Sequence, residues 1–361
     1  MITKINNTRG RRLLNPIDIA NARLGGPEAL LAWYDFTDKS TMGSTSSGGV
    51  NPPGIGDTVM RIDNKAFNPG GAGAKALGAL AHQGDSSKAP LYLVGVEDGP
   101  YLGGKGGNSS CLFNGGFLEA VGAASVASTG KFSTTGLDMA NLTVYVVCDR
   151  LNPFATQRED VFFITSKNHT NQTMHEYCSF FFDEDKKGTF EMWETGASTS
   201  YASTKYDTAD DGNFRYHMYH TYDKYVNNDN YARLSADGLM QVGNDGGDGL
   251  PDPFYDKVMG PGYPGTALST SDTGTLDTVM ELDAAGTYHP SMTIGGQSRV
   301  DNTTAATNTF RGAIYEIVIF NTSHVKTTAL DKILWGTEDS ENWKDMLYYF
   351  KRKYQTIGLK R

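Results

Sequence analysis

The chain has 361 residues, of which 39% are hydrophobic and 20% are charged, with 42 Gly and 13 Pro. A chain of this length can bury a substantial core, either as two domains or as one large β-sandwich. Its 41 acidic residues outnumber 32 basic ones, and the net charge of −9 argues against a general nucleic-acid binder. No apolar run reaches the roughly 18 residues of a transmembrane helix, so no membrane partner is expected. The three cysteines (Cys111, Cys148 and Cys178) cannot form a closed disulfide framework.

The two ends of the chain are basic, although the body is acidic. Residues 1–23 carry a net charge of +4 and residues 344–361 one of +5, which leaves −18 on residues 24–343. This asymmetry indicates ends that meet an acidic neighbour, although solvated tails would show the same pattern. The cations expected to serve in anchoring and assembly are Arg9, Arg11, Arg12, Lys351, Arg352 and Lys353.

Residues 1–27 show neither a helical nor a strand period, and we expect them to form an extended basic arm that a partner would order. Leu13-Leu14 is followed by Asn15-Pro16 and Asp18. The apolar core of about 7–15 residues that a secretory signal needs is therefore missing. If the protein leaves a cell, we expect another route, such as release of an assembled particle on lysis.

Strand patterns begin directly after this arm. Leu30–Phe36 (LLAWYDF) is a short aromatic-rich apolar run between turn residues, and Val59–Asp63 is a shorter candidate. Residues 68–110 are dominated by Gly-containing turns and are expected to be a long loop insertion, a feature that is often functional. Cys111–Glu119 (CLFNGGFLE) is typical of two strands separated by a glycine pair.

The strongest strand patterns lie in the middle of the chain. Leu142–Asp149 (LTVYVVCD) is rich in Val, Tyr and Thr, and Asp160–Thr165 follows as another strand. Glu176–Phe182 and Thr189–Glu194 flank a charged loop that ends in a glycine, which predicts a hairpin. Phe214–Tyr222 alternates with period two and also predicts a strand.

Residues 236–275, dense in Gly, Asp and Pro, are expected to be a second long loop insertion. Ser291–Gly295 and Phe310–Phe320 (FRGAIYEIVIF) return to strand patterns. Simple alternation in the last strand would place one set of side chains on one face and a second set on the other. The first set is Ile314, Glu316 and Val318, and the second is Tyr315, Ile317 and Ile319.

Near the end the apolar period changes to that of a helix, which predicts a terminal helix over about residues 341–357. The apolar stripe consists of Trp343, Leu347, Phe350 and Tyr354. The basic residues at 351–353 lie in its later turns, where cations suit the helix dipole.

Many antiparallel strands with Gly- and Pro-rich connections predict an all-β fold, an antiparallel β-sandwich (jelly roll) closed by one helix. The chain contains, in order, LLAWYDFTDKST, CLFNGGFLE, LTVYVVCDR, TIGG with FRGAIYEIVIFN, and NWKDMLYYFKRKY. Together these segments resemble the concanavalin A-like lectin/glucanase family, the laminin G-like jelly roll found in phage and environmental bacterial proteins. The resemblance covers about residues 28–357. It implies one sandwich over residues 28–361, with the terminal helix packed on its flank and the two insertions departing from the family.

Glycosidases on this fold need two carboxyl groups about 5–5.5 Å apart, which on a strand requires acidic residues two apart on one face. The family's glucanases show Glu-x-Asp and a further Glu on one strand, and no such run occurs here. Asp183 and Asp185 have the spacing but lie at a predicted hairpin tip, whereas Glu191 and Glu194 would face opposite sides. The sequence therefore predicts a non-enzymatic protein with no catalytic residues, and glycoside hydrolysis is the weaker alternative.

A calcium ion is the one cofactor that the sequence suggests, and none is required. A Gly-rich loop supplies oxygen ligands from Asn244, Asp245, Asp248 and Asp252. Calcium accepts 6–8 oxygen ligands in flexible geometry. Asp-Gly pairs are also ordinary turn formers and the EF-hand spacing is absent, so a plain turn stays open as the alternative.

Carbohydrate binding needs aromatic platforms beside Asn or Asp side chains on loops. The candidate residues are Tyr222, Tyr225, Asn227, Asn228, Asp229 and Tyr231. Tyrosine offers a broad amphipathic contact area at low entropic cost. The alternative is that these tyrosines line the sandwich.

Two function classes follow from these observations, since the fold hosts lectins, glucanases and structural virion modules alike. The first is a structural protein of a phage particle (a head decoration, spike or tail component), made in the host cytoplasm. Its partners would be other virion proteins, further copies of itself and host surface glycans. The second is a lectin-like carbohydrate-binding module that is not part of a virion.

Overall fold

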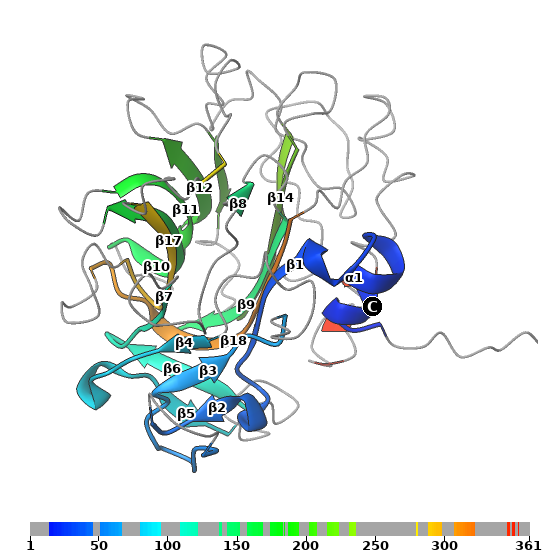
Figure 1. Cartoon of the computed structure of the whole chain (residues 1–361). Helices are drawn as coiled ribbons and strands as arrows, with labels where there is room; N and C mark the ends of the chain where they lie inside the picture. The colour runs from blue at the N-terminus through cyan, green and yellow to red at the C-terminus, as the bar shows by residue number, and fades with distance from the viewer. Residues whose placement is uncertain are drawn as a thin grey trace, which may run out of the picture.

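Two antiparallel β-sheets lie face to face and form the body of the structure (Figure 1). The computed structural model describes residues 14–45, 51–66, 80–94, 109–121, 137–138, 143–151, 157–168, 174–182, 184, 187–194, 202–207, 215–223, 231–235, 279–280, 288–297, 307–321, 345–346, 349–350 and 353. None of the helices in these ranges is both long and apolar enough to cross a membrane.

The first sheet has the strand order β15-β14-β9-β18-β6-β5, and β1 also pairs with β18. Its strands are β1 (Leu30–Asp35), β5 (Leu91–Leu93), β6 (Ser110–Asn114), β9 (Thr143–Arg150), β14 (Arg215–Asp223), β15 (Tyr231–Ser235) and β18 (Arg311–Phe320). β18 is central, because it pairs with β9 on one side and with β6 and then β1 on the other. We call this sheet the first sheet throughout.

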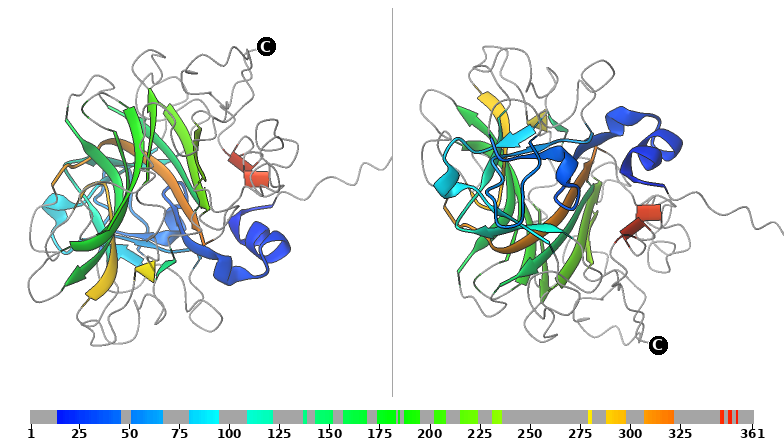
Figure 2. Two further views of the ribbon diagram at one scale, coloured as in Figure 1. Left: turned by 90° about the horizontal axis from the view of Figure 1, so that it is seen from above. Right: turned by 90° about the horizontal axis from the view of Figure 1, so that it is seen from below.

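The second sheet has the order β13-β12-β11-β10-β17-β7-β4-β3-β2. Its strands are β2 (Met42–Gly43), β3 (Arg61–Asp63), β4 (Leu80–His82), β7 (Leu118–Val121), β10 (Glu159–Asn168), β11 (Met174–Phe182), β12 (Lys187–Glu194), β13 (Ala202–Asp207) and β17 (Tyr288–Ile294). A small separate ladder pairs β8 (Leu137–Asp138) with β16 (Val279–Met280). Figure 2 shows the two main layers from above and from below.

These sheets confirm the predicted all-β sandwich. The predicted hairpin of β11 and β12 and the strands at β1, β9, β10, β14, β17 and β18 are all present. One expectation was wrong, because residues 68–110 are not only loop. Within that range β4 joins the second sheet, the 3₁₀ helix η4 (Ser86–Lys88) follows, and β5 forms an edge of the first sheet. The predicted insertion at 236–275 lies outside the described residues.

The expectation of an extended arm over residues 1–27 was also wrong in its second half, where helix α1 (Pro16–Arg23) and the 3₁₀ helix η1 (Pro27–Ala29) form. Asn15, Pro16 and Asp18, which interrupt the apolar run after Leu14 in the sequence, form the N-terminal cap of α1. Asn15 Oδ1 accepts from the Asp18 amide at 2.9 Å, and Asp18 Oδ2 accepts from the Asn15 amide at 3.3 Å. This reciprocal pair is a capping box, and Pro16 suits the first helical position.

The core has two parts, one on each face of the first sheet. Between the sheets, aromatic and aliphatic side chains such as Tyr34, Phe113 and Phe162 form the larger cluster. On the outer face, Trp33 and Tyr145 belong to a second cluster. Two helical segments cover this outer cluster, which therefore includes residues from both ends of the chain.

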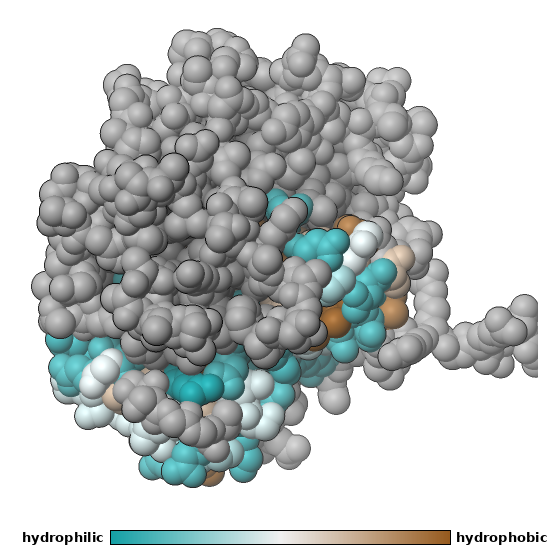
Figure 3. All heavy atoms as spheres, viewed as in Figure 1, coloured by the Kyte–Doolittle hydropathy of each residue, from teal (hydrophilic) through white to brown (hydrophobic). Residues whose placement is uncertain are grey.

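The first of these segments is α1, which contributes Ile19 and Ala20 to the outer cluster. The second is the terminal helix, whose described helical residues are Asp345, Met346, Tyr349, Phe350 and Lys353. Met346 and Phe350 are buried in the outer cluster. Figures 1 and 2 show α1 and the terminal helix close together on this flank. On the surface around α1, hydrophilic and hydrophobic residues are mixed (Figure 3).

A salt bridge ties the two sheets together at one end of the interior. Arg150 on β9 is buried, and its Nη2 lies 3.0 Å from Glu159 Oε2 on β10. The guanidinium group also lies 4.3 Å from the ring centre of Phe182 on β11. A buried charge of this kind is tolerated only because its partner and the ring replace water.

The close packing of β18 on β9 predicts that Gly312 tolerates no side chain. A Cβ atom at this position would overlap the Asp149 carbonyl oxygen and lie 2.7 Å from the Phe310 ring. We expect Gly312→Ala to lower the free energy of unfolding by about 1–3 kcal/mol or more, measured by urea denaturation. Gly84→Ala is the matched control, because nothing lies within 4 Å of a Cβ atom there. Equal stability of the two variants would contradict this packing.

Candidate functional site

A β-bulge in β18 brings two consecutive side chains to the outer face of the first sheet. The register against β9 shifts between Ile314 and Glu316. Ile314 and Ile317 consequently pack between the sheets, whereas Tyr315 joins the outer cluster. Glu316 also points outward, since its carboxylate bonds to Trp33 of that cluster. The alternation predicted from the sequence put Tyr315 and Glu316 on opposite faces of the strand. That prediction was wrong at this point, because a bulge inserts one extra residue.

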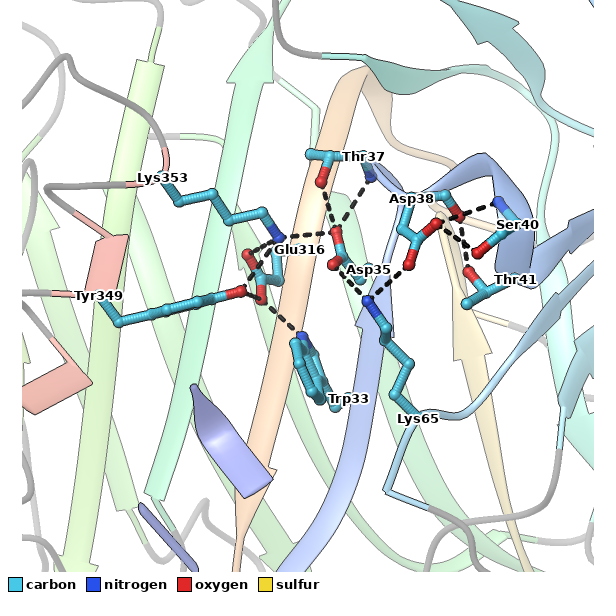
Figure 4. A network of polar contacts seen from close by, with 10 residues as sticks. All are labelled: Trp33, Asp35, Thr37, Asp38, Ser40, Thr41, Lys65, Glu316, Tyr349 and Lys353. Carbon is cyan, nitrogen blue, oxygen red and sulfur yellow. Dashed lines mark hydrogen bonds and ion pairs between the residues drawn. The ribbon is translucent and has the colours of Figure 1, made fainter. Parts of the chain in front are cut away.

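Glu316 is fully buried and accepts hydrogen bonds on both carboxylate oxygens. Oε1 accepts from Trp33 Nε1 at 2.6 Å and from the Tyr349 hydroxyl at 2.8 Å. Oε2 lies 2.8 Å from Lys353 Nζ. One strand of the sheet and the terminal helix thus supply the groups that compensate this charge (Figure 4).

Asp35 lies directly opposite Glu316 in the pairing of β1 with β18 and is also buried. Its Oδ1 lies 2.7 Å from Lys353 Nζ, and its Oδ2 lies 2.8 Å from Lys65 Nζ. The Thr37 amide and hydroxyl donate to Oδ1 at 3.1 and 2.6 Å. Lys353 therefore bridges two buried carboxylates that belong to different strands.

Lys65 completes the arrangement from the segment that runs beside β1. Its ammonium group contacts Asp38 at 2.9 Å and lies 4.5 Å from the centre of the Trp33 ring. Asn64 fixes this segment, because its Oδ1 accepts from the Trp33 amide at 2.9 Å and its Nδ2 donates to the Leu31 carbonyl. We call the six residues Trp33, Asp35, Lys65, Glu316, Tyr349 and Lys353 the outer-face network.

The charges of this network shift the pKa values of its members. Burial alone would raise the pKa of Asp35, but Lys353 and Lys65 outweigh burial, and the pKa lies below its usual range. For Lys65, burial lowers the pKa, but Asp35 and Asp38 together outweigh burial and the net shift is upward. Burial and the neighbouring Glu316 raise the pKa of Tyr349 well above its usual range, so its hydroxyl remains a donor.

The outer-face network can therefore hold a proton and orient an amine. It also fastens the terminal helix to the first sheet. It unites β1, residue 65, β18 and the terminal helix, which are far apart in sequence. In the described ranges, no group of three or more His, Cys, Asp or Glu side chains is arranged to hold a metal ion.

The hairpin of β14 and β15 carries two of the predicted glycan-binding residues. Tyr222 pairs with Ala232 and Asp223 with Tyr231, so Tyr222 and Tyr231 flank the connection at residues 224–230. That connection contains the other four candidates, Tyr225, Asn227, Asn228 and Asp229. The register thus brings Tyr222 and Tyr231 to one end of this hairpin, whereas the other four candidates lie outside the described residues.

Other predicted site residues lie outside the described ranges. These are the calcium candidates Asn244, Asp245, Asp248 and Asp252 and the anchoring candidates Arg9, Arg11, Arg12, Lys351 and Arg352. Lys353 is described, and its acidic neighbours, Asp35 and Glu316, belong to its own chain. Its ammonium group is engaged within the fold rather than presented to a partner.

Sequence reasoning missed the other five members of the outer-face network. One signal was available, since Glu316 interrupts an otherwise apolar strand and a charge within such a strand requires a partner. The identity of that partner depends on long-range register, which a single sequence does not reveal.

No protein-family model matches the chain, and no curated protein sequence matches it either. Similar solved structures include sialidases and a carbohydrate-binding module. A leech intramolecular trans-sialidase is 11% identical with a TM-score of 0.33, over 54% of this chain and 23% of the enzyme. The CBM40 module of a Ruminococcus gnavus IT-sialidase is 11% identical with a TM-score of 0.32, over 54% of this chain and 82% of the module. A Trypanosoma rangeli sialidase is 9% identical with a TM-score of 0.39, over 92% of this chain and 33% of that enzyme.

The chain therefore spans about a quarter of the length of the leech enzyme and a third of the trypanosomal one. The β-sandwich fold is established by the strands themselves. The finer resemblance to the concanavalin A-like family stays a prediction from the sequence.

Removal of the lysine that bridges the two carboxylates should destabilise the fold. We expect Lys353→Met to lower the free energy of unfolding by about 3–5 kcal/mol, because Asp35 and the buried Glu316 carboxylate lose the side chain that they share. The double variant Lys353→Met/Glu316→Gln should recover part of this loss. Chemical denaturation monitored by tryptophan fluorescence measures both.

Lys88→Met serves as the matched control for that experiment. Lys88, the last residue of η4, lies 3.5 Å from Asp85, whose side chain is 47% exposed, and ion pairs with such exposed partners contribute little. A loss for Lys353→Met no larger than that for Lys88→Met would contradict a structural role of the outer-face network.

Proposed function

We propose that the chain is a non-enzymatic structural subunit of a phage particle whose β-sandwich contacts host surface glycans. The observation that carries the glycan contact is the register of β14 against β15, which places Tyr222 and Tyr231 on either side of residues 224–230. Aromatic rings beside Asn and Asp side chains suit the apolar faces and hydroxyl groups of sugars. The hairpin lies at an edge of the first sheet.

The state of the buried carboxylates supports a non-enzymatic role. A glycosidase needs one carboxyl group as the acid and a second as nucleophile or base, both facing a cleft. In the described part of the chain, Asp35 and Glu316 share Lys353, Glu159 pairs with Arg150, and Asp160 pairs with Arg158 at 2.9 Å. Each of these carboxylates is paired with a cation of the same chain.

The arrangement of the two ends supports assembly. α1 and the terminal helix pack together on one flank of the sandwich, and Leu14 also packs against the outer cluster there. Residues 1–13, which precede Leu14 in the sequence, contain the cations Arg9, Arg11 and Arg12. An arm that starts on the anchored flank leaves other surfaces of the sandwich for contacts outside the particle.

A glycan array tests the first part of the proposal. We expect the full chain to bind at least one glycan at micromolar concentration. The variant Tyr225→Ala should weaken that binding about tenfold or more, because a sugar face loses its platform. Asn227→Ala with Asn228→Ala should have a similar effect, whereas Asn114→Ala, an exposed asparagine at the end of β6, should have none. Absence of any bound glycan would contradict the proposed contact.

Mass spectrometry of purified phage particles tests the second part. We expect the full-length chain in particles, and we expect a variant without residues 1–13 to fold but to be lost from them. This truncation preserves the capping box of Asn15 and Asp18 and hence α1. If the chain is absent from particles yet binds glycans, the alternative of a free lectin-like module replaces the proposal.

A further inference from the structure

The ammonium group of Lys353 lies between two buried carboxylates that differ in their surroundings. Asp35 Oδ1 is 2.7 Å from Nζ, and Glu316 Oε2 is 2.8 Å from it. The Lys353 side chain is 19% exposed, whereas those of Asp35 and Glu316 are 5% and 0% exposed. An amine, a carboxyl group and a second carboxylate thus meet in a site that largely excludes water (Figure 4).

We propose that Lys353 and Asp35 react in the folded chain to form an intramolecular amide bond, with Glu316 as the group that moves the proton. The Lys353 amine, after it loses a proton to Glu316, attacks the Asp35 carboxyl carbon. The C–Oδ1 bond breaks, Oδ1 leaves as water with the protons given up by the amine, and Glu316 ends as it began. One ammonium group and one carboxylate give one amide and one water molecule, so no oxidant, reductant or activating co-reactant is needed.

Glu316 is held in the orientation that this role requires. Trp33 and Tyr349 both donate to its Oε1, which leaves Oε2 facing Lys353 Nζ. The Tyr349 hydroxyl also accepts from Lys353 Nζ at 3.1 Å. A proton acceptor fixed within hydrogen-bond reach of the amine is the geometric condition for general base catalysis.

The Asp35 carboxyl group is also polarised for attack. Lys65 Nζ lies 2.8 Å from Oδ2, where negative charge develops in the tetrahedral intermediate. Thr37 donates two hydrogen bonds to Oδ1, the oxygen that departs. The two oxygens therefore have different partners, one suited to an oxyanion and one to a leaving group.

Proximity favours the product, whereas Lys353 and Lys65 favour the charged form of Asp35. Proximity alone corresponds to effective concentrations of about 10⁵–10⁸ M for well-oriented groups. The register Asp35↔Glu316 and the packing of Met346 and Phe350 maintain this proximity.

The same geometry distinguishes the two lysines that contact Asp35. Lys353 contacts Glu316 directly, whereas Lys65 is shared between Asp35 and Asp38. The bond would therefore form at Lys353. It would join β1 to the terminal helix and close a loop of more than 300 residues, which restricts the unfolded chain as a disulfide does.

The intact mass of the folded, purified chain, measured under denaturing conditions, tests this proposal. We expect a mass below that of the sequence by one water molecule. Protease digestion should release a branched peptide that contains Asp35 and Lys353. The full sequence mass in the wild-type chain would overturn the proposal, and so would a branched peptide joined through Lys65 or Glu316.

Variants assign the roles of the individual groups. Lys353→Arg retains the positive charge but cannot form the amide, and it should show the full sequence mass. Glu316→Gln should also show the full mass, and a water loss that persists in this variant would overturn its role as the proton carrier. Lys88→Arg, distant on η4, should keep the water loss. The mass readout does not depend on glycan binding or on presence in particles, so its outcome is separate from that of the proposed function.

Discussion

The buried carboxylate of Glu316 is the constraint on which the arrangement of both chain ends depends. A charge removed from water is costly unless a cation and hydrogen-bond donors replace the solvent. Here the bulge in β18 turns Glu316 toward the outer face, and Trp33, Tyr349 and Lys353 compensate its charge. These contacts require β1 to pair with β18 in one register and the terminal helix to lie across them. The apolar contacts of Met346 and Phe350 bury one side of the terminal helix, while the polar contacts define the position of that helix on the first sheet.

Much of the fold could be predicted from the sequence, because strands with strong local patterns keep them in the structure. β9 and β18 contain the Val, Ile and Tyr runs that fit a pleated surface, and both occur within one residue of their predicted bounds. α1 was missed because Asn15, Pro16 and Asp18 look like an interruption of an apolar run, although they form a capping box. The bulge could not be predicted, since one extra residue in a strand leaves no local mark in the sequence.

The candidate sites differ in how much of each could be predicted from the sequence. The residues at 222–231 were grouped by composition alone, and the antiparallel register of β14 and β15 brings their flanking tyrosines to one connection. The outer-face network was not foreseen, because Asp35 and Lys353 are 318 residues apart and meet only through tertiary packing. The charge of Lys353 predicts that it meets an acidic neighbour. That neighbour is the chain's own sheet, which links the basic C-terminal end to the stability of the sandwich.

Hydrogen–deuterium exchange of the terminal helix tests most directly whether Glu316 holds it on the sheet. The account predicts that amides of residues 345–353 are protected in the wild-type chain and lose protection in Glu316→Gln. The amides of β10 and β11, on the second sheet, should retain theirs in the same variant. Rapid exchange of the terminal helix in the wild type, or unchanged protection in Glu316→Gln, would contradict the account.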